Sequence, residues 1–164
     1  MGQTVKAIIQ RGELVPDATV FELVRLNVSS DALGIVFDGF PRTIAQAEYL
    51  LDHYQLQKVF YLDLSETTAI QRISARRVCQ SCGENYNLNS QPPHTKDICD
   101  KCGGLLIIRN DDKPDAISKR FAEFYEQTSP LKEFFIKHNL LVNIKAEGTV
   151  QDIFDLLKVN LASR

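Results

Sequence analysis

The chain has 164 residues, of which 44% are hydrophobic, and this is enough apolar material for one compact domain with a buried core. Its net charge of −2 argues against non-specific nucleic-acid binding, because proteins of that class carry a strong basic excess. No apolar run approaches the roughly 20 residues of a membrane span, and the first residues lack the apolar stretch of a signal peptide. The sequence therefore predicts a cytoplasmic protein that binds neither nucleic acid nor membrane.

Four helices and two strands are expected in the first part of the chain. The helices should occupy residues 2–10, a segment opened by Pro16-Asp17, residues 43–52, and residues 65–76 with Ser65 as the cap. Two short apolar runs, residues 34–38 and 58–64, predict buried strands. The first run ends in Asp38 and leads directly into a Gly-Phe-Pro-Arg turn. Because ligands bind at the carboxyl ends of strands in open α/β sheets, we expect a binding site there.

The second part of the chain begins with a change of composition. Residues 78–112 are rich in turns and carry all four cysteines, with too little apolar material to fold unaided. We expect them to form a small inserted subdomain between two parts of the core, residues 1–77 and 113–164. Helices should follow Pro114, Pro130 and Gly148-Thr149, with a buried strand at residues 140–144. The alternation of strands and helices predicts an α/β fold with a doubly wound parallel sheet.

The four cysteines have the spacing of a metal site. Cys79 and Cys82 form one C-x-x-C pair and Cys99 and Cys102 another, sixteen residues further on. Two such pairs at this separation fit a tetrahedral zinc site, and four protein ligands leave no open position, so the zinc should be structural. The alternatives are two disulfides or four inert thiols. His94 lies between the pairs and is expected to be a surface residue.

Five motifs, taken together and in order, resemble adenylate kinase of the long type, in which a mobile lid can hold zinc. They are residues 12–17 (GELVPD), 38–42 (DGFPR), 76–79 (RRVC), 111–114 (DDKP) and 125–128 (YEQT). The resemblance covers essentially the whole chain. It implies the reaction ATP + AMP ⇌ 2 ADP with Mg²⁺, a P-loop NTPase-like core, and a protein that is a monomer when complete. Related nucleoside monophosphate kinases share the Gly-Phe-Pro-Arg turn, while Gln46 and the cysteines favour AMP.

The resemblance also implies roles for individual residues. AMP would be bound by Glu13, Leu14, Val15, Gly39, Phe40, Pro41, Arg42, Gln46, Arg109 and Arg120. ATP would be bound by Arg72, Arg76, Asn85, Tyr86 and Val150, and catalysis would depend on Arg42, Arg76, Arg109, Arg120 and Asp38. Asp111 and Asp112 match lid carboxylates. These residue types suit phosphoryl transfer, which needs little covalent work and much positioning of charge, and arginine grips a phosphate through a planar fork.

One feature of the family is missing from the 164 residues. No segment reads G-x-x-x-x-G-K-[ST], so no loop of this chain matches the phosphate cradle of ATP-binding proteins. The resemblance implies that a first strand, this loop, a helix and a further strand come before residue 1. Three explanations are open: a truncated chain, which we favour, a partner polypeptide that supplies the missing unit, or a non-catalytic AMP-binding module. We expect the chain alone to have little or no activity.

Overall fold

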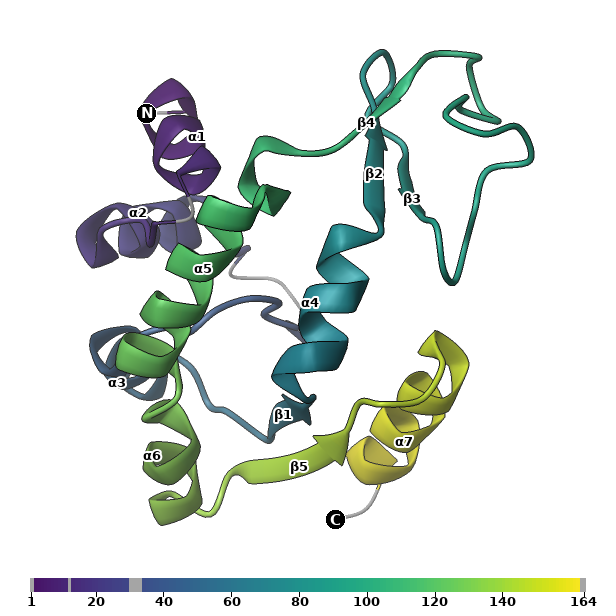
Figure 1. Cartoon of the computed structure of the whole chain (residues 1–164). Helices are drawn as coiled ribbons and strands as arrows, with labels where there is room; N and C mark the ends of the chain where they lie inside the picture. The colour runs from purple at the N-terminus through teal and green to yellow at the C-terminus, as the bar shows by residue number, and fades with distance from the viewer. Residues whose placement is uncertain (1, 12, 30–33, 163–164) are drawn as a thin grey trace. The chain divides into compact units, whose positions relative to one another are not determined.

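The computed structural model describes residues 2–11, 13–29 and 34–162 (Figure 1). The chain divides into two compact units, each made of two segments. The first unit comprises Met1–Tyr61 and Lys119–Asn143, and the second comprises Leu62–Ser118 and Ile144–Arg164. None of the helices in the described ranges combines the length and hydropathy needed to cross a bilayer.

Helices make up most of the first unit. They are α1 (Gly2–Gln10), α2 (Asp17–Asn27), α3 (Ile44–His53), the end of α5 (Pro114–Glu123), the π-helix η2 (Phe124–Thr128) and α6 (Leu131–Lys137). The α-helices begin within a residue or two of the predicted positions, and η2 directly continues α5. Thr43 caps α3, since its hydroxyl accepts from the backbone N–H of Gln46 at 3.2 Å. The expected stop of the first helix at Gly12 lies outside the described residues.

The core of the first unit forms where α3 meets α6. Ala47, Leu131 and Phe135 are 0%, 6% and 1% exposed, and partly buried apolar side chains pack around them. The hydrophobic spacing of the two helices therefore places one face of each against the other.

The predicted strand at residues 34–38 is wrong. Residues 34–37 form no strand, and the side chains of Ile35 and Val36 are 40% and 94% exposed. An apolar run becomes a buried strand only when a neighbouring strand pairs with its backbone. In the described part of the chain no strand does so.

The other two predicted strands are present and form a parallel pair. β1 (Val59–Asp63) and β5 (Leu141–Lys145) make a two-stranded sheet. The N–H of Val59 donates to the carbonyl of Leu140, and the N–H of Ala146 donates to the carbonyl of Asp63, so both strands run the same way. The predicted α/β class with a parallel sheet is confirmed.

The second unit contains a small antiparallel sheet joined directly to a helix (Figure 1). Its elements are α4 (Glu66–Ser74), β2 (Arg76–Cys79), β3 (Asn85–Asn87), β4 (Leu106–Ile107), the 3₁₀ turn η1 (Asn110–Asp112), the start of α5, and α7 (Val150–Ala162). The strand order is β3-β2-β4. Only Ala75 separates α4 from β2, so the helix ends two residues earlier than predicted.

α7 has no buried residue in the second unit. Its apolar side chains Val150, Phe154 and Val159 are 80%, 52% and 68% exposed. The final helix predicted after Gly148-Thr149 is thus present, but its packing contributes little to the core of the unit.

Candidate functional site

The four cysteines gather at one point in the second unit. Their sulfur atoms all lie within 4.8 Å of one another. Cys79 and Cys102 are 3.4 Å apart and Cys82 and Cys99 are 3.6 Å apart, and none is in a disulfide. Four sulfurs around a tetrahedral zinc ion, each at about 2.3 Å, would be separated by about 3.8 Å. The cluster therefore has the size of a four-thiolate metal site, and the disulfide alternative does not describe this structure.

Two backbone turns with the same hydrogen-bond pattern direct the thiols towards one another. In the first turn the N–H of Gly83 donates to the carbonyl of Cys79 at 3.0 Å, and in the second the N–H of Gly103 donates to the carbonyl of Cys99 at 2.8 Å. Both glycines have a left-handed backbone, with φ of +75° and +73°. A side chain at these positions would strain the turn, which explains the glycine after each C-x-x-C pair.

Without a bound cation, the ionisation of one thiol of the cluster disfavours the ionisation of its neighbours. The Tyr86 hydroxyl beside the sulfur lowers the pKa of Cys99 to about 6. The backbone N–H of Gly104 favours the Cys102 thiolate, but the neighbouring sulfur of Cys82 works against it and the pKa of Cys102 is raised to about 12. One thiol thus ionises easily and another resists, because negative charge accumulates at one point. A bound metal ion would remove this conflict.

Two arginines near the ends of the cysteine subdomain (residues 78–112) each bind a carboxylate. The guanidinium of Arg76 binds both carboxylate oxygens of Asp112, with its Nε 2.7 Å from Oδ2. The Asp112 side chain is fully buried, and its hydrogen bond raises the pKa of Arg76. Arg109 likewise binds Asp111, with distances of 2.9 and 2.6 Å. Both arginines are therefore held in place, and both remain about one third exposed.

Arg72 and Glu147 fasten the loop after β5 to α4. Nη2 of Arg72 donates to the carbonyls of Glu147 and Gly148 at 3.3 and 3.0 Å. The Glu147 carboxylate accepts from the N–H of Ser65 and the hydroxyl of Thr68, both at 2.9 Å. These bonds lower the pKa of Glu147, the Ser65 N–H contributing most. The loop that leads to Val150 is thus tied to both the first and the last turn of α4.

A separate network surrounds Gln46 in the first unit. Its side chain is buried, its Oε1 accepts from the N–H of Arg42 at 2.7 Å, and its Nε2 donates to Asp17 at 2.7 Å. The hydroxyl of Thr43 also donates to Asp17, at 3.1 Å. These bonds fix which end of the Gln46 amide is the donor, and within the described residues one N–H of this amide is left for another partner.

The turn at residues 39–42 lies next to this network. Gly39 has a φ of +69°, Phe40-Pro41 is a cis peptide, and Nε of Arg42 donates to the Gly39 carbonyl at 2.7 Å. The Thr128 hydroxyl donates to the Arg42 carbonyl at 2.9 Å and so ties the turn to η2. The Arg42 guanidinium is exposed and held close to the backbone.

Residues 1–140 match the family model described as "Adenylate kinase". The chain belongs to the adenylate kinase family. Proteins named "Adenylate kinase" from Treponema denticola, Pseudothermotoga lettingae and Methanocella arvoryzae are each 41% identical to it. The alignments cover 97%, 96% and 93% of this chain, and 77%, 78% and 74% of the respective relatives. Adenylate kinases are phosphotransferases that bind ATP, AMP and ADP, and the cysteine cluster fits the zinc lid of the long type.

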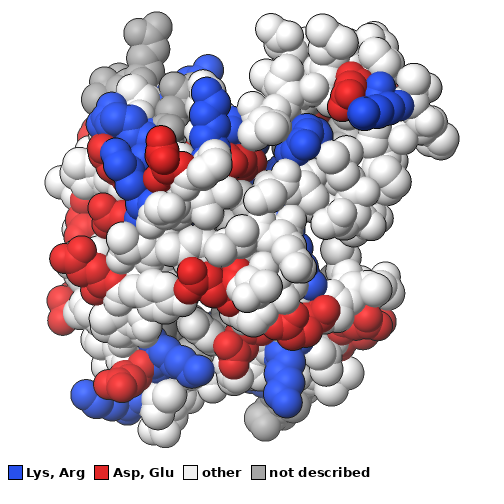
Figure 2. Space-filling model, viewed as in Figure 1, with Lys and Arg blue, Asp and Glu red and all other residues white. Residues whose placement is uncertain are grey.

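In this adenylate kinase the candidate site residues fall in both units. Arg72, Arg76 and Arg109 belong to the second unit, Arg42 and Arg120 to the first. Their convergence on one phosphoryl group stays a prediction. The face in Figure 2 shows basic and acidic side chains interspersed, so its positive charge is not concentrated in one patch.

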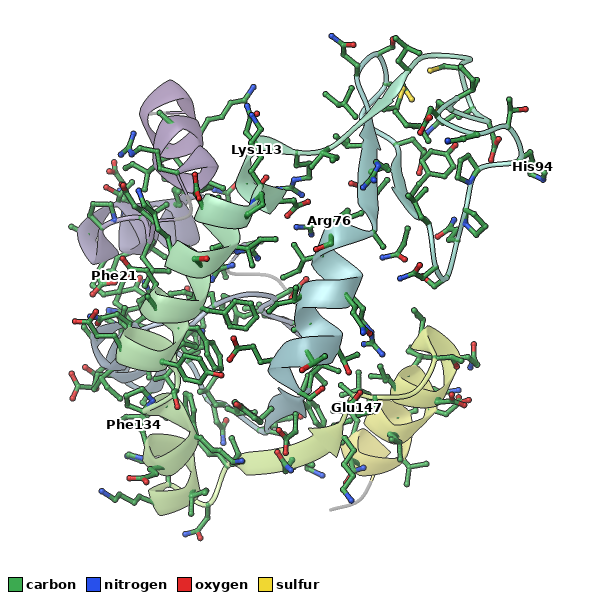
Figure 3. The ribbon with its side chains drawn as sticks, in the orientation of Figure 1. Phe21, Arg76, His94, Lys113, Phe134 and Glu147 are labelled. Atoms are coloured by element: carbon green, nitrogen blue, oxygen red, sulfur yellow. The ribbon has the colours of Figure 1, made fainter. Side chains whose placement is uncertain are left out.

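The remaining candidates have more varied surroundings. Glu13 is paired with Arg11 at 2.8 Å, while Leu14 and Val15 are half-buried. Asp38 and Val150 are exposed, as is Asn85, whereas the Tyr86 ring is buried beside Cys99. His94 lies on the exposed loop, as Figure 3 shows, with its ring 3.0 Å from Asp100.

Sequence reasoning missed three residues that hold the candidates in place. Asp17 was noted as a helix start and as the last residue of the 12–17 motif, but not as the anchor of Gln46. Nothing local to Glu147, or to Thr128 in the 125–128 motif, indicates their partners, which lie 82 and 86 residues away in the chain.

Replacing Asp17 with alanine should lower the free energy of unfolding by about 1–3 kcal/mol, the cost of removing the acceptor of buried hydrogen bonds. The amide of buried Gln46 and the hydroxyl of Thr43 would both lose this acceptor. Urea unfolding measures the change. Glu22→Ala removes an exposed carboxylate from the same helix and is the matched control. Equal losses in the two variants would contradict the anchoring role.

Proposed function

We propose that these residues form the AMP site and the zinc lid of an enzyme that catalyses ATP + AMP ⇌ 2 ADP. Strand β2 supports the proposal best. It begins at Arg76, the arginine assigned to the ATP phosphates, and ends at Cys79, a ligand of the proposed metal. A metal ion held by the cysteines would therefore determine the position of a phosphate-binding arginine only three residues away.

The AMP half of the site is assigned to the first unit and to Arg109. The backbone of residues 13–15 and the amide of Gln46 would bind the adenine. Arg42, with Arg109 and Arg120, would bind the phosphate. Gln46 is suited to the task, because its amide orientation is already fixed before a nucleotide binds.

The ATP half is assigned to the second unit. Arg72 and Arg76 would bind the phosphates, exposed Asn85 would contact the nucleotide, and the carbonyl of Val150 would accept from the adenine. A role for Tyr86 in ATP binding stays a prediction. Closing of the lid would exclude water and strengthen each of these charge interactions.

Two metals complete the proposal. The four thiols fit zinc in size, number and chemistry, and with no open position the ion would be structural. Mg²⁺ would arrive with the nucleotide and neutralise phosphate charge during transfer. Asp38 suits a water-mediated contact with Mg²⁺, because its carboxylate is exposed and makes no hydrogen bond or ion pair within the described residues.

The proposed reaction requires a loop that binds the ATP phosphates, and none of the 164 residues forms the glycine-rich motif of such a loop. We expect the chain alone to bind AMP but to form ADP at least about 10³-fold more slowly than a chain that also carries such a loop. A single lost donor to developing charge already costs 10²–10³-fold. A coupled ADP assay on both forms, with calorimetric AMP titration of each, measures the difference. Comparable rates in the two forms would contradict the proposal.

The second candidate function is a non-catalytic AMP-binding module with a structural metal. The missing glycine-rich motif favours it, since the Gln46 network is intact without that motif. If the extended chain binds AMP and ATP yet forms no ADP, this alternative is correct. The cytoplasmic location and the monomeric state remain predictions, and sedimentation of the chain with and without nucleotide tests the latter.

A further inference from the structure

Tyr86 lies at the centre of the cysteine subdomain. It belongs to β3, where it pairs with Arg77 of β2, and its ring is 7% exposed. The ring packs in a small apolar core with Cys79, Cys99 and Leu106. The side chain therefore points into the metal cluster and not towards solvent, where a nucleotide would bind.

The hydroxyl of Tyr86 has two partners in the second cysteine turn. Its oxygen accepts from the backbone N–H of Asp100 at 2.8 Å and lies 3.5 Å from the sulfur of Cys99. A metal-bound cysteine has lost its proton, so its sulfur can only accept. In the metal-bound protein the tyrosine O–H must therefore donate to Cys99.

This contact distinguishes two turns that are otherwise alike. The backbone hydrogen bonds around Cys79 and Cys99 follow the same pattern. Among the described residues, Tyr86 is the one hydroxyl group hydrogen-bonded to a thiol of the cluster. A hydrogen bond from a neighbouring group orients a metal ligand and stabilises its charge.

We propose that Tyr86 is a positioning residue of the metal centre, holding the Cys99 sulfur in place for the metal by donating its hydroxyl proton. It also fixes the backbone of Asp100, the residue that follows this ligand. The inference rests on the proposed zinc lid and gives Tyr86 a task that its predicted contact with ATP does not include.

The test compares zinc-loaded wild type with Tyr86→Phe. Phenylalanine keeps the ring in the apolar core and removes only the hydroxyl. We expect 10–100-fold weaker zinc binding, the usual cost of losing such a supporting contact. Competition with a chelator of known affinity measures the binding constant, and transfer of zinc to a coloured chelator measures the rate of release. Tyr54→Phe, which alters a tyrosine in the first unit, is the matched control.

A second measurement separates positioning from a merely structural role. In the cobalt-substituted protein, loss of a hydrogen bond to one thiolate should shift the sulfur-to-cobalt charge-transfer band of Tyr86→Phe but not of Tyr54→Phe. If Tyr86→Phe fails to fold, site-specific replacement of Tyr86 by 3-fluorotyrosine keeps the ring and gives a stronger donor, and we expect slower zinc release.

The outcomes distinguish this inference from the proposed function. A wild-type chain that binds no zinc would overturn the metal lid itself. A wild type that binds zinc, together with Tyr86→Phe of unchanged affinity, release rate and spectrum, would overturn the role of Tyr86 alone. An unchanged release rate for the fluorotyrosine protein would do the same.

Discussion

Cys99→Ser should abolish tight zinc binding and unfold the cysteine subdomain while the core of the first unit stays folded. The subdomain has a core of only four buried apolar residues, two of which are cysteines of the cluster. Metal binding contributes roughly 10–16 kcal/mol in small structural zinc domains, so little else holds such a segment together. Hydrogen exchange measures the effect: amides of residues 79–106 should lose protection, and those around Phe135 should keep it.

The same pattern is expected when a chelator removes zinc from the wild type. Ser81→Ala, which changes a residue between Cys79 and Cys82, is the control and should keep both zinc and protection. Full protection after zinc removal would contradict a structural role of the metal, and a wild type that binds no zinc would favour inert thiols, the alternative that the spacing alone leaves open.

Arg76→Met should destabilise the protein by about 1–3 kcal/mol, the cost of taking one partner from a buried acceptor, because Arg76 itself is about one third exposed. The Asp112 carboxylate has no exposed surface and loses a two-pronged, charge-assisted partner in this variant. Thermal or urea unfolding measures the loss. Arg77→Met is the matched control, because Arg77 donates to the backbone carbonyls of Ser74 and Arg76.

A double variant decides whether the charge of Asp112 is the cause. Arg76→Met combined with Asp112→Leu replaces the pair with apolar side chains, and we expect it to recover most of the lost stability. If the double variant is as unstable as Arg76→Met, the aliphatic packing of Arg76 would account for the loss, and the buried carboxylate would not.

Local signals were sufficient to predict the helices and the cysteine cluster. Caps such as Thr43 and Ser65 and the periodic apolar positions depend on residues within one or two turns. The spacing of Cys79, Cys82, Cys99 and Cys102 likewise describes two short turns, whose geometry is set locally. These features could be read from the sequence because few distant residues take part in them.

Features that depend on distant partners could not be predicted in the same way. The run at residues 34–38 has a strand's composition, but pairing decides whether such a run becomes a strand. Arg76 and Asp112 are 36 residues apart, and nothing in either motif shows that they meet. The contact of Tyr86 with Cys99 could not be predicted either, because it exists only after β3 is paired with β2.

The hydrogen bonds of Arg72 have a consequence for the affinity of an anion at that position. In the described part of the chain the guanidinium uses only Nη2 in hydrogen bonds, so Nε and Nη1 keep donors for a phosphate. A phosphate that binds here would contact an Arg72 side chain whose rotamer is already fixed by these hydrogen bonds. Ordering a long, mobile side chain on binding costs about 0.5–1.5 kcal/mol. Because Arg72 is already ordered in the folded protein, an anion that binds there should not lose this free energy.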